Sequence, residues 1–435
     1  MKTKLLPSHS HRVGKSPPRD GIEFRSLIYV FGIALALRAA WGTLQLLRAA
    51  DAAALSLPDE QQYWSIAQSL WRGTGMQDEL GFRATRMPLY PGILALFAGL
   101  SHGVVAAKVL HWIVGAACAA LVAGAAGVVV GRRVGWVAGL VVAMDPFQIF
   151  TSSLLLTETP FIAALVGLWW SAWPIIERDS PDPTYKRWLI VGAVSTLVIY
   201  LRVSSVGLVL VLLLYVVSCR RFNRRAVAGA CLAATMVVLS LLPWAVRNSR
   251  VTGAWCWLTH RGGISLYDGV GPQADGSSNL GEIKQMPAVQ GMNEVEWNRY
   301  FLRASFESIR SDPGRIVRLA GVKMCRMWNP FPNVDTHQSR LERFVAAAWM
   351  VPLYMGAVAG ACWWVKRDGQ TGLRHVLYLL LPAIYLSVLH ALFVGSVRYR
   401  LGATPMLEIL AAWFLVAAFE YLRPTTREAH ESVER

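Results

Sequence analysis

Two groups of charged and aromatic residues stand close to the first long apolar segment of this chain. Asp59 and Glu60 precede Tyr63 and Trp64, and Arg86 opens the run Arg-Met-Pro-Leu-Tyr-Pro. Adjacent carboxylates at the end of a membrane helix cost desolvation free energy unless they stay hydrated or find partners. A carboxylate can accept a proton from a hydroxyl group, and the aromatic rings could stack on a sugar. The pattern favours a reaction site at the edge of a membrane.

Two acids have both a structural and a chemical interpretation. Asp59 follows Pro58 and could cap a helix, with Gln62 completing a capping box, while one carboxylate oxygen stays free for chemistry. Tyr63 would then share a helix face with Asp59. Glu158 lies at the start of the fourth expected apolar segment, where an acid in the first turn complements the helix dipole. An acid at the membrane margin is equally a candidate for function.

The candidate cations suit an anionic ligand, because a guanidinium presents a rigid fork to phosphate oxygens. Arg86 and Arg202 fit this role or extend to lipid headgroups. Arg398 has Tyr399, Arg400 and His390 as neighbours, which favours a binding site. The further candidates are Arg38, inside the first apolar segment, and Arg247, which is as consistent with a structural role.

Composition places the chain among membrane proteins. Its 435 residues are 54% hydrophobic and only 16% charged, with a mean hydropathy of +0.39. Soluble domains are about a quarter charged. The net charge of +16 lies largely in short loops beside apolar segments, where Lys and Arg report membrane orientation, so nucleic-acid binding is disfavoured. The six cysteines form no metal-binding motif. The sequence does not decide whether Cys256 and Cys325 form a disulfide, which requires that their segment faces an oxidising space.

The apolar segments predict an all-α polytopic membrane protein with about 10 (10–13) transmembrane helices. The expected spans lie near residues 25–47, 105–129, 134–152, 157–176, 188–203, 204–219, 226–245, 342–365, 373–394 and 402–422. An even number returns both termini to one side. The basic residues of the tails and of alternate loops make that side the cytoplasm. The apolar run 89–100 is too short to cross, so an interfacial or re-entrant helix on the outer face is expected.

This topology divides the chain into five regions. They are a disordered basic cytoplasmic tail (1–24), a transmembrane catalytic module (25–245, with a first outer loop 48–104), an extracytoplasmic loop domain (246–341), the last transmembrane helices (342–422) and a cytoplasmic tail (423–435). The loop domain is expected to be small and mainly helical. The predicted location is the plasma membrane, the inner membrane of a bacterium, crossed many times, with the reacting groups outside.

The motifs, taken in order, resemble those of the GT-C superfamily of integral-membrane glycosyltransferases. The relatives concerned are protein O-mannosyltransferases, aminoarabinose transferases and RgtA/B/C/D-like enzymes. The resemblance covers roughly residues 25–420. It is carried by DE-xx-Y after the first span, R-x-PLYP, LLLTETPF, an Arg after the fifth span, PWAVRN and H-x7-RYR. Gly402 departs from the pattern, because relatives more often have Pro at this position near Arg398.

The resemblance implies transfer of a sugar from a polyprenyl-phosphate donor on the outer face. Asp59 matches the proposed general base, and Glu158 matches an acid that orients the acceptor or holds a metal. Arg398 matches an arginine near the donor phosphate. The other expected substrate-binding residues are Glu60, Tyr63, Arg86, Arg202, His390, Tyr399 and Arg400.

Residue chemistry agrees with such a transfer. A polyprenyl phosphate leaves with its negative charge stabilised by an arginine, without needing a proton. The acceptor hydroxyl is a poor nucleophile, and a carboxylate base accelerates its attack by typically about 10²–10⁴-fold. One base without a carboxylate nucleophile predicts inversion of configuration. The acceptor, whether glycolipid, glycan or protein, and the sugar itself, hexose or pentose, stay open.

Other functions remain compatible with the sequence. A flippase or transporter for a lipid-linked sugar would favour charges deep in several spans and internal repeats, which are not evident beyond Arg38 and Arg202. An envelope polysaccharide polymerase would use the same substrates, and an inactive scaffold is disfavoured by the intact acids. No cofactor is certain, but a divalent metal could join Asp59, Glu158 and a histidine such as His260 or His337.

Overall fold

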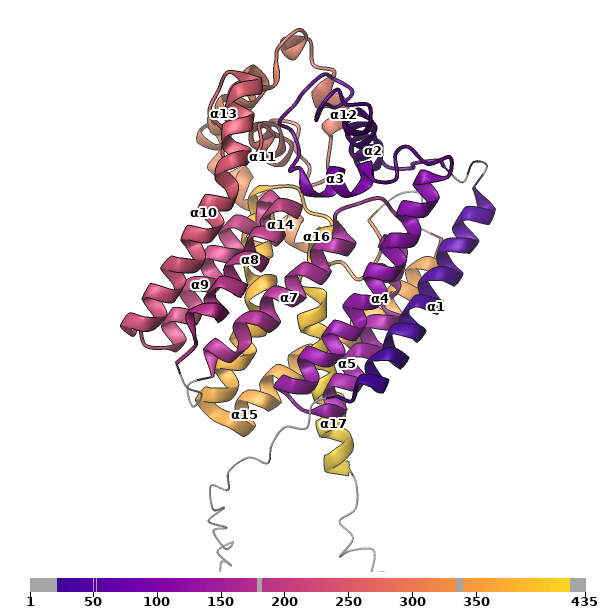
Figure 1. The fold of residues 1–435 in the computed structure, drawn as a ribbon, viewed down its shortest axis with the longest axis vertical. Helices are drawn as coiled ribbons and strands as arrows, with labels where there is room; N and C mark the ends of the chain where they lie inside the picture. Colours follow the sequence, from indigo (N-terminus) through magenta and orange to yellow (C-terminus); the bar gives the residue numbers. More distant parts are fainter. Residues whose placement is uncertain (1–21, 50, 52, 178–181, 334–338, 423–435) are drawn as a thin grey trace, which may run out of the picture.

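The computed structural model describes residues 22–49, 51, 53–177, 182–333 and 339–422, and within them it contains helices and no strand. A bundle of long helices carries a cap of shorter helices at one end (Figure 1). This confirms the all-α polytopic membrane fold expected from the sequence. The two tails, the loop around Arg178 and the segment with His337 lie outside the described residues.

Nine of the ten expected spans each coincide with one helical segment of the bundle, whereas the expected span 134–152 is divided at Asp145 into the shorter helices α5 and α6. The bundle consists of α1 (Phe24–Arg48), α4 (Gly103–Val129), α5 (Arg132–Met144), α6 (Pro146–Thr151), α7 (Glu158–Ile176), α8 (Tyr185–Leu201), η1 (Val203–Ser205), α9 (Val206–Cys219), α10 (Arg224–Thr252), α15 (Arg340–Leu392) and α17 (Thr404–Leu422). Non-helical backbone at Gly369 divides α15 into two arms, which correspond to two expected spans. Among the described helices, six are long and apolar enough to cross a membrane: α1, α4, α7, α10, α15 and α17.

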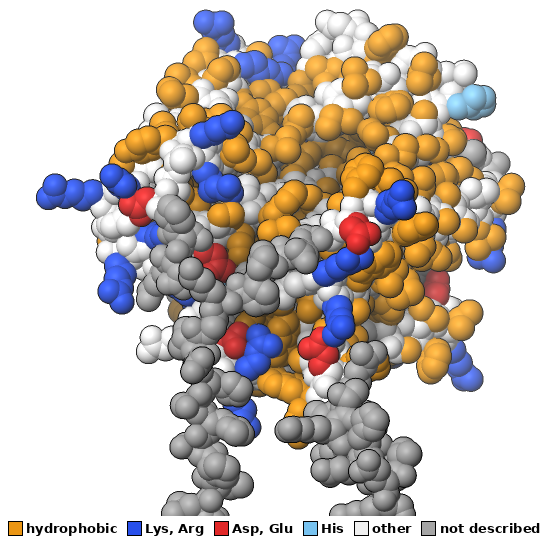
Figure 2. Space-filling model, turned by 60° about the horizontal axis from the view of Figure 1, so that its bottom comes forward, with side chains coloured by type: hydrophobic (Ala, Val, Ile, Leu, Met, Phe, Trp, Pro, Cys, Tyr) orange, Lys and Arg blue, Asp and Glu red, His pale blue; other side chains and the backbone are white. Residues whose placement is uncertain are grey.

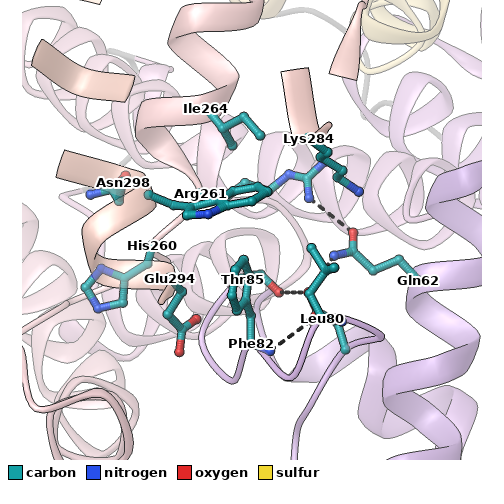
Figure 3. Close-up of a pocket in the computed structure, with 12 residues that line it drawn as sticks. Gln62, Leu80, Phe82, Thr85, His260, Arg261, Ile264, Lys284, Glu294 and Asn298 are labelled. Carbon is teal, nitrogen blue, oxygen red and sulfur yellow. Dashed lines mark hydrogen bonds between the residues drawn. The ribbon is translucent and has the colours of Figure 1, made fainter. Parts of the chain in front are cut away.

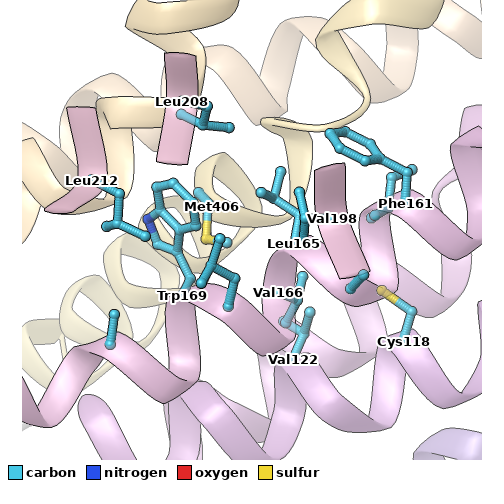
Figure 4. Packing of buried hydrophobic residues seen from close by; sticks show 14 of the residues in the cluster. Cys118, Val122, Phe161, Leu165, Val166, Trp169, Val198, Leu208, Leu212 and Met406 are labelled. Atoms are coloured by element: carbon cyan, nitrogen blue, oxygen red, sulfur yellow. The ribbon is translucent and has the colours of Figure 1, made fainter. Parts of the chain in front are cut away.

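Helix α7 lies at the centre of the bundle, because residues on several of its faces are buried (Figure 4). Phe161, Leu165 and Trp169 of α7 belong to the same core cluster as residues of α4, α8, α9 and α17. Small residues allow some helices to approach closely. A Cβ at Gly360 of α15 would lie 2.2 Å from the carbonyl oxygen of Leu410 in α17. This packing fixes the helix ends next to the cap, where the candidate residues lie.

The cap is built from the two long segments 48–104 and 246–341 between bundle helices, together with the short helix α16. It contains α2 (Pro58–Trp71), α3 (Leu89–Ala95), α11 (Gly262–Val270), α12 (Leu280–Lys284), η2 (Pro287–Val289), α13 (Glu294–Ser311), α14 (Pro313–Trp328) and α16 (Val397–Arg400). The apolar run 89–100 thus begins with a helix of only seven residues, too short to cross a bilayer. A small core of Ile264, Ile283, Val289, Trp297 and Phe301 holds the cap together.

The opposite end of the bundle carries many Lys and Arg side chains (Figure 2). Arg132 at the start of α5 pairs with Glu23 at 2.7 Å, and Arg133 pairs with Glu420 near the end of α17 at 2.6 Å. The first and last described helices therefore meet at the same end of the bundle, as an even number of crossings requires. Cys256 and Cys325 are free thiols, so the disulfide left open by the sequence is not formed here.

Candidate active site

The side chain that caps the N-terminus of α2 is that of Glu60, and not that of Asp59. Leu57 takes the extended N-cap position and Pro58 is the first helical residue. One oxygen of Glu60 accepts the N–H of Leu57 at 3.1 Å, and the other accepts the N–H of Leu155 at 2.8 Å. The predicted Asp59 cap with Gln62 was therefore wrong, because the N-cap lies two residues earlier, at Leu57. Glu60 is 1% exposed and ties α2 to the turn before α7.

Asp59 is surrounded by three guanidinium groups. Its Oδ1 lies 2.5 Å from Nη2 of Arg86 and 3.9 Å from Nη2 of Arg261, and its Oδ2 lies 3.3 Å from Nη2 of Arg398. Burial by itself would raise the pKa of Asp59, but the three positive charges hold this pKa well below its ordinary value. The carboxylate side chain is still 30% exposed, so it is both fully ionised and accessible.

Arg398 joins Asp59 to Glu158. Nε and Nη2 of Arg398 lie 3.0 Å and 2.9 Å from the same oxygen, Oε1 of Glu158. Nη1 of Arg202 lies 3.7 Å from that oxygen. Glu158 is 1% exposed, and its Oε2 has no hydrogen-bond partner among the described residues. The two acids that the sequence singled out thus belong to one charged cluster.

Aromatic rings and a histidine flank the arginines of this cluster. The Tyr399 ring stacks on His390 with centroids 4.0 Å apart. Arg202 lies over the rings of Phe161 and Tyr399, at 5.2 Å and 5.5 Å from their centroids. The short helix α16 supplies Arg398 and Tyr399, and the C-terminal end of α15 supplies His390. Residues from three distant parts of the chain therefore form one wall of the site.

Gln62 holds two of the arginines in place. Its Oε1 accepts hydrogen bonds from Nε and Nη2 of Arg86, at 2.9 Å and 2.7 Å, and from Nη1 of Arg261 at 3.1 Å. Its Nε2 donates to Asp78 at 2.9 Å. Arg86 also donates to the Tyr63 hydroxyl at 3.0 Å. Gln62 follows Asp59 by three residues and shares its helix face. The sequence analysis interpreted this spacing as a capping box and did not identify Gln62 as a site residue.

Arg261 was not among the candidate residues identified from the sequence. It precedes α11 and reaches α2 only through the tertiary fold. Burial and the neighbouring charge of Arg86 lower the pKa of Arg261, whereas Asp59 raises it. Its place beside Asp59 makes it part of the cluster.

Three of the predicted cations lie elsewhere. Arg400 is fully buried, donates to the carbonyl oxygens of Met327 and Asn329, and lies over the Phe147 ring. Arg38 donates to the carbonyl oxygens of Val142 and Ala143 within the bundle. Arg247 donates to the carbonyl oxygen of Arg83. These contacts assign the three arginines to the framework around the site.

The cluster fits an anion better than a metal ion. Within the described ranges, no group of three or more His, Cys, Asp or Glu side chains is placed to hold a metal. Asp59 and Glu158 both face arginines, whose positive charges repel a cation. His260, the described histidine considered from the sequence, lies 3.3 Å from the Thr252 hydroxyl. Guanidinium groups are well suited to phosphate oxygens.

Comparisons with known proteins give similarity in structure only. No protein-family model and no curated protein matches the chain in sequence. The archaeal oligosaccharyltransferase AglB from Archaeoglobus fulgidus, in complex with an inhibitory peptide and a dolichol-phosphate, is similar with a TM-score of 0.58 and 13% identity. The match covers 94% of this chain and 51% of AglB.

Two further solved structures are similar. The apo form of the same oligosaccharyltransferase gives a TM-score of 0.57 at 13% identity, over 94% of this chain and 52% of that one. ArnT from Cupriavidus metallidurans, bound to undecaprenyl phosphate, gives 0.42 at 14% identity, over 90% and 77%. This chain spans about half the length of the oligosaccharyltransferase. The resemblance inferred from the motifs is thus confirmed for the fold, and the chain has the fold of the GT-C membrane glycosyltransferases.

Proposed function

We propose that the protein is a glycosyltransferase that moves a sugar from a polyprenyl-phosphate donor to an acceptor hydroxyl on the outer face of the membrane, with inversion. The observation that carries this proposal is the Arg398 bridge between Asp59 and Glu158. It lies where the membrane bundle meets the polar cap, so a lipid-borne phosphate and a water-borne acceptor can both reach it. The AglB structure, which shares this fold, contains a dolichol-phosphate.

Arg398 and Arg202 are the residues proposed to bind the donor phosphate. Both lie at the outer ends of membrane segments, next to Tyr399. In the transfer, negative charge grows on the phosphate oxygens as the bond to the anomeric carbon breaks. Fixed guanidinium groups stabilise that charge, because they need no reorganisation at the moment of reaction.

Asp59 is proposed to accept the proton of the acceptor hydroxyl. In the ligand-free protein its arginine partners keep its pKa low, which makes it a weak base. A donor phosphate that takes up hydrogen bonds from Arg398 weakens the attraction between Arg398 and Asp59, so the pKa of Asp59 rises towards that of an ordinary carboxylate. The base would thus gain strength when the donor is present.

Glu158 is proposed as a positioning residue. Its Oε1 aligns Arg398 through two nitrogen atoms, and its Oε2 has no partner among the described side chains and backbone groups. A buried oxygen without a partner is costly. A hydroxyl group of the sugar or the acceptor could satisfy it.

The proposed arrangement in the membrane follows the distribution of charge. The basic end of the bundle would face the cytoplasm, and the cap, residues 246–341 with the first outer loop 48–104, would lie outside. Residues 25–245 would form the catalytic module, completed by α16 from the region 342–422. The plasma membrane of a bacterium, with both termini inside, is the proposed location.

A strain that lacks the protein tests the function. Mass spectrometry of its envelope glycolipids, glycans and glycoproteins should show one sugar missing from an acceptor and a polyprenyl-phosphate sugar accumulating. The wild-type chain should restore the sugar, and Asp59→Asn at equal membrane abundance should not. Restoration by Asp59→Asn would contradict the catalytic assignment and favour a flippase, a polymerase or a scaffold.

A further inference from the structure

A pocket in the cap adjoins the charged cluster. Arg202 and Arg398, which are proposed to bind the donor phosphate, do not line it. Its walls come from α2, the loop before α3, and the segments α11–α13 (Figure 3). The hollow between these walls is open to solvent, and its space counted to the opening is about 370 Å³. Gln62 and Arg261 line the pocket and also contact the Asp59 cluster, since Arg261 lies 3.9 Å from Asp59. A ligand here would lie beside the proposed base.

The two carboxylates of the pocket are already occupied by protein donors. Asp78 accepts hydrogen bonds from Gln62, from the Thr85 hydroxyl and from two backbone N–H groups. Glu294 accepts the N–H groups of Arg83 and Ala84 at 3.1 Å and 2.8 Å. Both acids therefore hold the loop before α3 in shape, and they leave little capacity to bind a cationic ligand.

Two donor groups of the pocket are unoccupied. Lys284 has no hydrogen bond or ion pair through its side chain within the described ranges, although it is partly buried next to Arg261. Asn298 accepts the N–H of Gly263 at 2.7 Å through Oδ1, and its side-chain nitrogen has no partner among described residues. Burial, and then the charges of Arg261 and Arg86, lower the pKa of Lys284. An anion between Lys284 and Arg261 would offset this repulsion.

The remaining wall is aromatic and rigid. Trp297 contacts Phe82 edge to face with centroids 5.2 Å apart, and its indole N–H donates to the carbonyl oxygen of Val289 at 2.8 Å. A fixed aromatic side chain next to hydrogen-bond donors suits a sugar ring, which has apolar C–H groups and polar hydroxyls.

We infer that this pocket is the acceptor subsite and that it selects a sugar bearing an anionic group, a phosphate or a carboxylate. Lys284 and Arg261 bind the anion, Asn298 donates to a hydroxyl, and Trp297 lies against the ring. This inference rests on the proposed function, because it takes the bound sugar to be the acceptor whose hydroxyl faces Asp59.

Equilibrium binding to the purified full-length chain in nanodiscs tests the inference. The probes are glucose 1-phosphate, glucuronic acid and neutral methyl glucoside, with undecaprenyl phosphate added to saturation so that Arg202 and Arg398 are occupied. Both anionic sugars should bind about tenfold more tightly than methyl glucoside, as one added ion pair predicts. Lys284→Met should abolish this preference, Lys284→Arg should keep it, and Lys186→Met, at the other end of the bundle, should leave it unchanged.

The outcomes separate the two proposals. Equal binding of neutral and anionic sugars, or an unchanged preference in folded Lys284→Met, overturns the acceptor inference even if undecaprenyl phosphate binds. Failure of undecaprenyl phosphate to bind counts against the proposed donor, while the Lys284 variants still report on the pocket. Thermal unfolding of each variant shows that a lost preference does not come from a lost fold.

Discussion

Arg398 directs two of its nitrogen atoms, Nε at 3.0 Å and Nη2 at 2.9 Å, to a single oxygen of Glu158. Glu158 begins the central helix α7, whereas Arg398 belongs to α16 near the other end of the chain. The pair therefore fixes the guanidinium against the most buried helix of the bundle. Arg398 also lies within ion-pair distance of Asp59. The orientation of α16 therefore affects the pKa of Asp59, the proposed base.

Replacing Asp59 by Asn removes the proposed base and one negative charge among three arginines. We expect sugar transfer to fall by about 10²–10⁴-fold, the usual contribution of a general base. Asp182→Asn is the matched control, because Asp182 pairs with Arg225 on the surface at the opposite end. Transfer is measured with the polyprenyl-linked sugar identified from the deletion strain. A loss shared by both variants would point to expression and not to chemistry.

Lysine in place of Arg398 keeps the charge but loses the fork that contacts Glu158. We expect transfer per folded molecule to fall by about 10–100-fold, as the loss of a charge-assisted hydrogen bond predicts. Thermal stability should change little, because lysine keeps a positive charge beside Glu158 and Asp59. Thermal unfolding curves test the expected stability, and initial rates of transfer test the expected loss of activity.

The same substitution at Arg400 should act on stability. Arg400 is fully buried and caps the carbonyl oxygens at the end of α14. Arg400→Lys leaves buried acceptors without a donor, which costs about 1–3 kcal/mol. Per folded molecule, Arg400→Lys should transfer more sugar than Arg398→Lys. Equal loss of transfer in the two variants would mean that Arg400 also binds substrate.

Gln62→Leu tests the residue that links Arg86, Arg261 and Asp78. Leucine fills similar space but leaves the arginine donors without their shared acceptor. We expect kcat to fall about tenfold while KM for the donor stays nearly constant, because Gln62 contacts neither Arg398 nor Arg202. Gln62→Glu keeps an acceptor and should restore part of the rate. A change confined to the donor KM would contradict this positioning role.

Lys323 gives a pH-dependent prediction for stability. It is fully buried and donates to the carbonyl oxygens of Ala391 and Leu392 at the end of α15. Burial, assisted by the charge of Arg315, lowers the pKa of Lys323 from 10.5 to about 8. Between these values the unfolded chain holds a proton that the folded chain has released, so the stability contribution rises with pH through this window.

The expected size is up to about 3 kcal/mol between about pH 8 and pH 10.5, from the free energy that one pKa unit represents. The unfolding temperatures of the wild type and of Lys323→Met should therefore diverge as the pH rises, in favour of the wild type. Lys366→Met, at an exposed position, should run parallel to the wild type. Parallel curves for Lys323→Met as well would contradict the depressed pKa.

The helical segments and the sidedness of the key residues could be predicted from the sequence. Both are local properties, since about twenty apolar residues suffice to cross a bilayer and basic loops mark one side. That reasoning placed Asp59, Glu158 and Arg398 at the same end of the bundle. The helix start at Pro58 was misjudged by two residues, because Asp59 is a favourable N-cap type whereas Leu57, the observed N-cap, is not.

The tertiary structure decided which residues of that end meet. Arg398 and Arg400 look equivalent in sequence, but two residues turn a helix by about 200°, so one faces Glu158 and the other faces α14. Arg261 and Gln62 join the site only because the cap folds over α2. The sequence alone determined that acids and arginines would gather at one membrane surface. Their pairing required the helix rotations and close packing that only the whole fold sets.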